Sequence, residues 1–382
     1  MFGLQDLREI QPVYNWFEKM RAEYPVYYDE GMRMWHVFRY EDVRAVLNDH
    51  GRFSSQAYGL GGSFLGDTLV GKDPPDHRKL RNLVNQAFTP RSVAHLEGRV
   101  QVIAQELLDE VRSAGKMDIV SDIAFPLPAK VIAEMLGVPS EDWNIFQRWA
   151  RMDSSGPGAM QQENGRSMQE EMSDYFARLL GERRRAPRED LVSALSVAEV
   201  DGERLSEHEL VSFCMLLLAA GQETTKNLIA NATVCFTDRR DALEHLKREP
   251  ALMPTAIEEV LRYLPPVWFV MRMTTSEIEL AGQKIPAGQL VVPWMASGNR
   301  DRAQFPDPDH FDIERTPNRH VTFGHGIHFC IGAPLARLEA KVTLPMMLEQ
   351  LKDLRVVEDT PIKAHMGLVF VIRSLPVTFQ AY

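Results

Sequence analysis

The residues best suited to chemistry lie in one loop near the C-terminal end, residues 323–332, with Cys330 at its centre. Glycines stand on both sides of this cysteine, and the following residues, 333–341, predict a helix with a proline at an early position. A cysteine just before a helix faces free backbone N–H groups and the positive end of the helix dipole, which both favour the thiolate. The loop therefore predicts a thiolate ligand for a metal such as iron.

Two alternatives for this loop stay open on the residues alone. A lone cysteine beside a glycine-rich turn is often a buried structural residue. A histidine could also be the metal ligand, since the chain has 11 histidines, but they form no zinc-like His-x-x-x-His pair and the three cysteines form no Cys-x-x-Cys pair. Cys330 is the preferred ligand.

The spacing Phe-x-x-Gly-x-x-x-Cys-x-Gly resembles the haem-binding loop of the cytochromes P450, with Phe323, Gly326, Cys330 and Gly332 in the matching positions. The resemblance implies haem b (iron protoporphyrin IX) as cofactor and Cys330 as its iron ligand. It also implies that Phe323, Gly324 and Gly332 contact the haem. The implied fold is mainly α with small β sheets, with the haem between a long central helix and the helix after the cysteine loop.

A long helix is predicted from Ser206 to about Thr237, opening with a Ser-x-x-Glu capping box. Polar residues within 220–225 directly follow an apolar run, and buried polar groups need partners or a purpose. Gly221 removes a side chain, so a planar ligand could lie against the backbone there. Thr224 could donate a hydrogen bond to the carbonyl of Ala220, which would loosen the helix locally.

This helical segment also resembles the family's Ala-Gly-x-(Asp/Glu)-Thr pattern beside the oxygen site. The resemblance implies that Ala220 and Gly221 contact the haem, and that Glu223 and Thr224 relay protons to dioxygen. The alternative is that these polar side chains simply face solvent.

Haem carries two propionates that need cationic or hydrogen-bonding partners when partly buried. Candidates come from three separate places: His77 and Arg81 on one face of a predicted helix, Arg272, and His328 two residues before Cys330. Each alone is often a solvated side chain, but together they match the family's propionate contacts.

Glu259 and Arg262 share a face of another predicted helix. They could be a surface ion pair, worth about 0.3–0.5 kcal/mol. In the resembled family a Glu-x-x-Arg pair is instead buried and pins the segment before the cysteine loop, which predicts a structural role.

Length and composition limit the remaining possibilities. The chain has 382 residues, 45% of them hydrophobic, and no interdomain linker, so we expect a single domain over residues 1–382. A net charge of −10 disfavours nucleic acid. Few cysteines, no signal-peptide pattern and a longest apolar run of only Phe213–Ala220 predict a soluble, cytoplasmic protein without a membrane anchor. A monomer is expected.

The resemblance, which runs from about Asp73 to the end, implies a monooxygenase that uses dioxygen and takes electrons from a ferredoxin or flavodoxin with its reductase. Arg319, Arg337 and Lys341 could meet such an acidic donor, or could be scattered surface charges. A haem sensor and a peroxygenase remain alternative functions.

The expected distal pocket is mostly apolar, which predicts a lipophilic small-molecule substrate such as a terpenoid, fatty acid, steroid or polyketide. Its expected segments are Tyr58–Leu65, a lid over Met152–Arg166, Ala219–Thr224, Val267–Met271 and Leu368–Val369.

Overall fold

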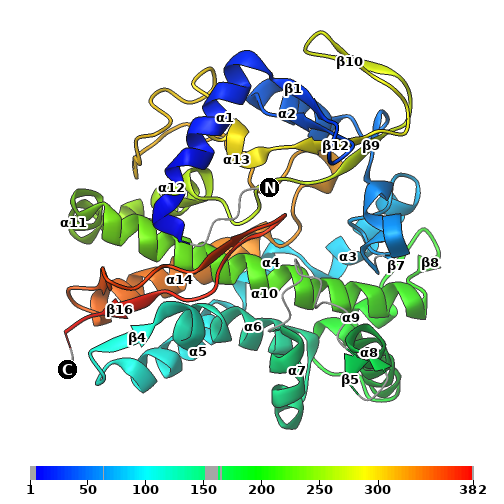
Figure 1. The fold of residues 1–382 in the computed structure, drawn as a ribbon. Helices are drawn as coiled ribbons and strands as arrows, with labels where there is room; N and C mark the ends of the chain where they lie inside the picture. Colours follow the sequence, from blue (N-terminus) through cyan, green and yellow to red (C-terminus); the bar gives the residue numbers. More distant parts are fainter. Residues whose placement is uncertain (1–5, 63, 151–161, 164–165, 381–382) are drawn as a thin grey trace.

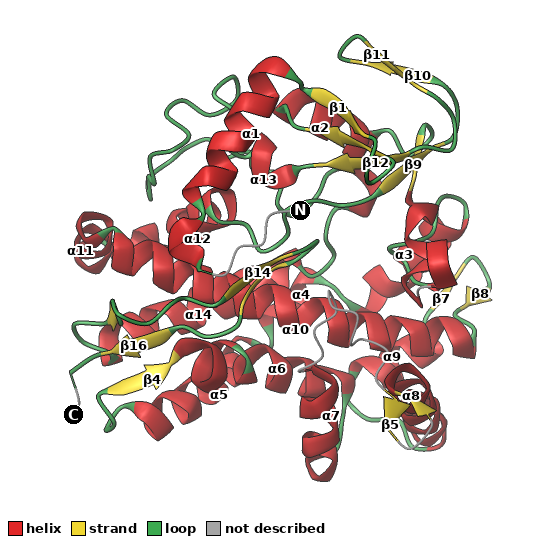
Figure 2. Ribbon diagram, in the orientation of Figure 1, coloured by secondary structure: helices red, strands yellow, loops and turns green. Residues whose placement is uncertain are grey.

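The computed structural model describes residues 6–62, 64–150, 162–163 and 166–380. The protein is mainly helical with several small sheets, as predicted (Figure 2). One long helix, α10 (Glu207–Asp238), crosses the molecule. Helices α6 (Pro126–Leu136), α8 (Met168–Arg185) and α14 (Ala333–Gln350) pack against it (Figure 1).

The predicted capping box starts α10. The Ser206 hydroxyl accepts the Glu209 N–H, and the Glu209 carboxylate accepts the Ser206 N–H. Most side chains along the 32 residues of the helix are buried on every side, which is typical of a helix inside a large core.

The other helices surround this core or cover its edges. They are α1 (Gln11–Glu23), α2 (Tyr40–Asn48), α3 (Asp76–Ala87), α4 (Pro90–Ala94), α5 (Glu97–Val111), α7 (Trp143–Ala150), α9 (Leu191–Val197), α11 (Arg240–Arg248), α12 (Met253–Tyr263) and α13 (Met295–Gly298).

The largest sheet joins strands from both ends of the chain. Its order is β1 (Val26–Asp29), β2 (Met34–Val37), β12 (Leu290–Pro293), β9 (Arg272–Thr274) and β3 (Phe53–Ser54). Strand β12 runs parallel to β2, whereas the other neighbours are antiparallel. This register puts Ser54 opposite Met273, so the segment after β3 lies beside Arg272.

The remaining sheets are small. One contains β13 (Arg355–Val356), β16 (Pro376–Thr378) and β4 (Lys116–Asp118), and the others are pairs: β10 (Ile278–Leu280) with β11 (Gln283–Ile285), β14 (Ala364–Met366) with β15 (Phe370–Ile372), β5 (Gln162–Glu163) with β6 (Arg166–Ser167), and β7 (Glu199–Val200) with β8 (Glu203–Arg204). The predicted lid over Met152–Arg166 falls almost entirely outside the described residues.

Apolar side chains from the whole chain share one large core, which runs in sequence from Leu7 to Phe379. A second, smaller cluster packs around the five-stranded sheet. In the part of the chain that the structure describes, no helix combines the length and the apolar character that crossing a membrane requires.

Candidate functional site

The loop that carries Cys330 folds back on itself immediately before α14. The N–H of Cys330 donates to the carbonyl of Phe323 at 2.9 Å. Gly324 and Gly326 adopt positive φ angles of 75° and 70°, which side chains disfavour. At Gly326 a Cβ atom would also come within 3.1 Å of the Leu47 carbonyl oxygen. The glycines of this loop are therefore required by its turns and by close backbone contact.

The sulfur of Cys330 lies at the start of α14, as predicted. The N–H groups of Gly332 and Ala333 favour its thiolate, and so does the charge of Arg81. Burial outweighs them, however, and raises the pKa of the thiol. The predicted effect of the helix start is therefore present, and a bound cation would supply the remaining stabilisation of the thiolate.

Cys330, at the start of α14, and Ala220, on α10, both have accessible surface inside the fold, which points to a space between these two helices. The Cys330 side chain is exposed although protein encloses it. Ala220 is likewise exposed in the middle of α10, while Leu218 and Gln222 beside it are buried. Because α10 and α14 pack together, these positions fit a flat ligand between the helices.

The polar residues in the middle of α10 are held by neighbours. The Thr224 hydroxyl donates to the Ala220 carbonyl at 2.7 Å, which confirms the predicted bond. Glu223 is 5% exposed and its carboxylate lies 3.7 Å from Nζ of Lys226, so it does not face solvent. The i,i+3 spacing of this ion pair is readable in the sequence, but Lys226 was not predicted as a partner.

A glycine at position 221 allows α10 to pack closely against α6. A Cβ atom at this position would lie 2.8 Å from Cδ1 of Ile132 on α6. The missing side chain therefore permits close packing of α10 on α6. The contact of the Gly221 backbone with a planar ligand stays a prediction.

The four candidates for propionate contacts come together. The rings of His77, on α3, and His328, in the short 3-10 helix η8 (Gly326–His328), have centroids 4.3 Å apart. Burial lowers the pKa of His77 to about 4 and that of His328 to about 2, and Arg81 and Arg272 lower the pKa of His328 further.

This cluster fits an anionic ligand. Arg272 is 4% exposed, and Nε2 of buried His77 has no hydrogen-bond partner among the described residues. Two guanidinium groups and an unpaired buried nitrogen are suited to carboxylates, which they could bind by charge-assisted hydrogen bonds.

Three residues that the sequence did not indicate support this cluster. The Ser55 hydroxyl lies 2.9 Å from Nε2 of His328. Asp73 accepts the Ser55 N–H at 2.9 Å and the Ser54 hydroxyl at 2.5 Å. No local spacing connects these serines to the cysteine loop, so only the folded chain reveals them.

Glu259 and Arg262 are both fully buried, which confirms the structural prediction and excludes a surface ion pair. Their two hydrogen bonds measure 2.7 and 2.8 Å. Arg262 also donates to the carbonyls of Asn299, Pro308 and His310. The pair thereby anchors the segment that leads to the cysteine loop.

The basic residues expected to meet an electron donor are mostly paired. Arg337 donates to Glu258 at 2.7 and 2.8 Å, and Lys341 lies 3.7 Å from Glu97. Of the three, Arg319 is the exposed residue for which no side-chain ion pair is described.

Three of the expected pocket segments meet in the structure. The Tyr58 hydroxyl accepts the Met271 N–H at 3.2 Å, which joins the first segment to the segment after α12. The Trp268 N–H donates to the Leu368 carbonyl at 3.1 Å, which joins that segment to the last one. Within the first segment, Leu60 is 53% exposed and Phe64 is half-buried.

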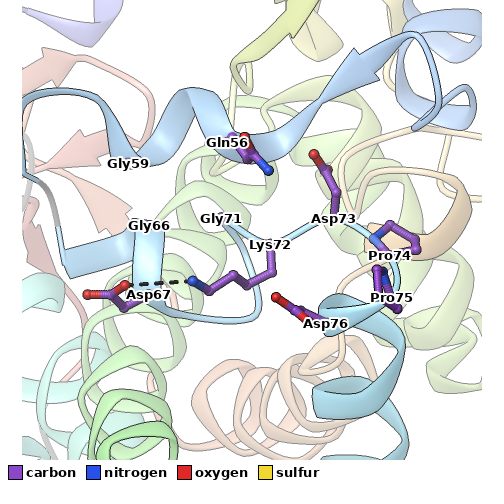
Figure 3. Close-up of a pocket in the computed structure, with 10 residues that line it drawn as sticks. All are labelled: Gln56, Gly59, Gly66, Asp67, Gly71, Lys72, Asp73, Pro74, Pro75 and Asp76. Atoms are coloured by element: carbon purple, nitrogen blue, oxygen red, sulfur yellow. Dashed lines mark ion pairs between the residues drawn. The ribbon is translucent and has the colours of Figure 1, made fainter. Parts of the chain in front are cut away.

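A polar cavity of about 430 Å³ lies beside the start of α3 (Figure 3). It is lined by Gln56, Gly59, Gly66, Asp67, Gly71, Lys72, Asp73, Pro74, Pro75 and Asp76. Nζ of Lys72 is 3.7 Å from the Asp67 carboxylate across this cavity. Because charged and glycine residues dominate its lining, it differs from the apolar substrate pocket predicted by the sequence.

A second cavity, of about 390 Å³, lies where α8 meets the first half of α10 and the 3-10 helix η3 (Phe64–Asp67). Its lining is mixed: Phe64, Ala177, Val211 and Met215 are apolar, whereas Asp67, Gln169, Ser173, Glu207, His208 and Ser212 are polar. Phe64 belongs to an expected pocket segment, whereas the residues of α8 and the start of α10 were not predicted.

Comparison with known proteins gives one consistent result. The family model described as Cytochrome P450 matches residues 1–137 and 238–380. The chain is 41% identical over 370 residues to Cytochrome P450 109 of Bacillus spizizenii, covering 94% of this chain and 90% of that protein. Its fold matches CYP109Q5 from Chondromyces apiculatus with a TM-score of 0.91 at 40% identity, covering 98% and 97% of the two chains. It also matches CYP109E1 from Bacillus megaterium in complex with testosterone, with a TM-score of 0.89 at 40% identity, covering 96% and 99%.

Proposed function

Because the chain belongs to the cytochrome P450 family of haem-containing oxidoreductases, we propose that it is a monooxygenase that oxidises a lipophilic small molecule with dioxygen. The single observation that carries this proposal is the enclosed, accessible sulfur of Cys330 at the start of α14, on the helix that packs against α10. When bound, haem supplies the iron centre at which dioxygen is activated, and a thiolate ligand donates electron density to it. The chain supplies the ligand, the orientation and an environment from which water is excluded.

We propose Cys330 as the iron ligand, with Phe323, Gly324 and Gly332 forming its side of the haem site. Ala220 would contact the haem from α10, since it is an exposed position in the middle of that helix. The backbone of Gly221 is a further proposed contact, and the side that a Cβ atom would occupy faces Ile132.

The propionates bind the cluster of His77, Arg81, Arg272 and His328. Both guanidinium groups can donate in pairs to a carboxylate, and the unpartnered Nε2 of His77 offers a further hydrogen bond. Two negative charges there offset the repulsion that lowers the pKa of His328.

Glu223 and Thr224 move protons toward dioxygen in this proposal. The Thr224 hydroxyl uses its proton to bond the Ala220 carbonyl, so its oxygen remains able to accept a further hydrogen bond. The Glu223 carboxylate, which is buried beside Lys226 and precedes Thr224 in the helix, is the second member of the proposed proton path.

The substrate is a lipophilic molecule of moderate size, and a steroid is the class with most support. CYP109E1, which is 40% identical to this chain, has been solved with testosterone and with corticosterone. The cavity of about 390 Å³ is in the size range of small-molecule pockets, and Phe64, Val211 and Met215 form the apolar part of its mixed lining.

Electrons come from a separate ferredoxin or flavodoxin with its reductase in this proposal. The described structure adds little to it, because Arg337 and Lys341 are already paired with carboxylates. Arg319 is exposed and has no described side-chain ion pair.

We further propose one domain over residues 1–382, supported by the core that extends from Leu7 to Phe379. A cytoplasmic location is supported by the thiols of Cys214 and Cys235, which are free and buried. The monomeric state stays a prediction.

The decisive experiment is the absorption spectrum of the purified, reduced protein under carbon monoxide. A thiolate ligand gives a strongly red-shifted Soret band, and Cys330→Ser should abolish that band. Cys235→Ser is the matched control, because Cys235 is buried in α10 and should leave the band in place. A wild-type spectrum typical of histidine ligation that persists in Cys330→Ser would overturn the proposal.

A further inference from the structure

Glu258 holds the side chain of Arg337 in a fixed position. The guanidinium donates Nε to one carboxylate oxygen at 2.7 Å and Nη2 to the other at 2.8 Å. Nε2 of His320 lies 3.0 Å from the same carboxylate. Although burial opposes it, hydrogen bonding from Arg337 and His320 lowers the pKa of Glu258 to about 2. The carboxylate is therefore charged throughout the useful pH range, and the two-bond geometry restricts Arg337 to one orientation.

The fixed guanidinium lies over the ring of Phe323, with its central carbon 4.5 Å from the ring centroid. The ring also contacts Phe329, at 6.2 Å between centroids. The backbone of the same phenylalanine accepts the Cys330 N–H at 2.9 Å. The backbone of Phe323 is therefore hydrogen-bonded to Cys330, and the ring of Phe323 makes a cation–π contact with Arg337.

We propose that Arg337 is a positioning residue for Cys330, which acts by holding the Phe323 ring in place over the cysteine loop. The inference rests on the proposed function, in which Cys330 binds iron. It assigns Arg337 a role in supporting the cysteine loop, whereas the sequence suggested contact with an electron donor.

The physical consequence concerns how strongly the sulfur donates electron density. A fixed Phe323 ring limits the access of water to the sulfur. The hydrogen bond from the Cys330 N–H to the Phe323 carbonyl fixes the backbone at the cysteine. If the ring moves, water can hydrogen-bond to the sulfur, which weakens its donation and raises the reduction potential of the bound iron.

Arg337→Lys is the informative variant, because it keeps the charge but loses the planar fork that both binds Glu258 and stacks on the ring. The reduction potential of the haem-loaded variant, measured by spectroelectrochemical titration, should rise by an amount equal to about a threefold or larger change in the ferric–ferrous equilibrium constant. Lys341→Arg is the matched control: it lies one turn further along α14, pairs with Glu97, and should leave the potential unchanged.

A double-mutant cycle separates positioning from a general structural effect. If Arg337 acts through the ring, Arg337→Lys should shift the potential far less in a Phe323→Leu background than in the wild type. Equal shifts in both backgrounds would contradict the proposal. A lowered melting temperature without a change in potential would also overturn it, because it would show a merely structural role.

The two proposals fail in different ways. A wild-type protein without the thiolate-type spectrum would refute the proposed function. A normal wild-type spectrum, together with an unchanged potential in Arg337→Lys and a raised KM for the electron donor, would refute only the positioning role and restore Arg337 to donor binding.

Discussion

The hydroxyl of Ser55 lies 2.9 Å from Nε2 of His328, although 273 residues separate them in sequence. Ser55 is fully buried and its own N–H is held by Asp73 at 2.9 Å. The bond therefore connects the start of the 3-10 helix η2 (Ser55–Gly62) to the cysteine loop. It fixes the orientation of a histidine whose ring packs against His77.

Ser55→Ala should destabilise the protein by about 1–3 kcal/mol, because a buried nitrogen of His328 loses its partner. Urea unfolding measures this change, and haem retention during unfolding should fall with it. Ser196→Ala is the control, since that hydroxyl bonds only within the region of α9, to the Ser193 carbonyl. Equal unfolding midpoints for Ser55→Ala and the parent protein would show that the bond contributes nothing.

Replacing Glu259 with Gln should be far more damaging, by about 3–5 kcal/mol, because it leaves the guanidinium of Arg262 buried without its counter-charge. The expected result is poor folding and little haem incorporation, measured as soluble yield and haem absorbance. Glu244→Gln is matched in spacing, since Glu244 and Lys247 are also three residues apart but lie on the surface. If both variants fold equally well, the pair does not anchor the segment before the cysteine loop.

Residues that belong to short sequence motifs were predictable from the sequence. Cys330, Glu259 and Arg262 lie in short motifs, and the bond from Thr224 to the Ala220 carbonyl follows from helix geometry alone. The long helix α10 was predicted almost to the residue, because its cap and its apolar run are both local signals.

Features that depend on distant contacts were not predictable. The parallel pairing of β12 with β2 joins segments more than 250 residues apart, and nothing near either strand indicates it. The close packing of Gly221 against Ile132 was not predictable either, because the two residues are distant in the sequence.

Helix boundaries also depend on details that periodicity misses. Between Pro90 and Val111 the chain forms two helices, α4 and α5, and not one continuous helix. Thr89 and Ser92 form a capping box that gives α4 its own start, and the chain turns again before Glu97.

Thr224→Ala should uncouple electron consumption from product formation when dioxygen is the oxidant, because the hydroxyl oxygen that would pass protons is lost. Product formed per reducing equivalent should fall severalfold, measured with a ferredoxin, its reductase and a substrate that shifts the Soret band. Product formed with hydrogen peroxide should change little, since peroxide already carries the protons.

Thr233→Ala is the matched control for this experiment. Its hydroxyl makes the same type of bond in the same helix, to the Ile229 carbonyl at 3.0 Å, but lies more than two turns further along. Unchanged coupling in Thr224→Ala, or equal losses in both variants, would remove Thr224 from the proton path and favour a peroxygenase or a sensor.

Glu339 should make the protein less stable as the pH rises above about 4. It is fully buried in α14, neither carboxylate oxygen has a hydrogen-bond partner among the described residues, and burial raises its pKa well above the ordinary value. The folded protein therefore keeps a proton that the unfolded chain releases near pH ~4.3. Above that pH the unfolded chain binds fewer protons, so the free energy of unfolding should fall as the pH rises toward the raised pKa, by up to about 1.4 kcal/mol per pH unit.

Glu339→Gln removes this titration while keeping the shape of the side chain. Urea unfolding of the two proteins should give similar midpoints near pH ~4, and the variant should become the more stable one as the pH is raised to about 8. Glu349→Gln, at an exposed position of the same helix, should unfold in parallel with the parent at every pH. If the parent and Glu339→Gln keep a constant difference across this range, Glu339 is not protonated in the folded protein, and a partner outside the described contacts must neutralise it.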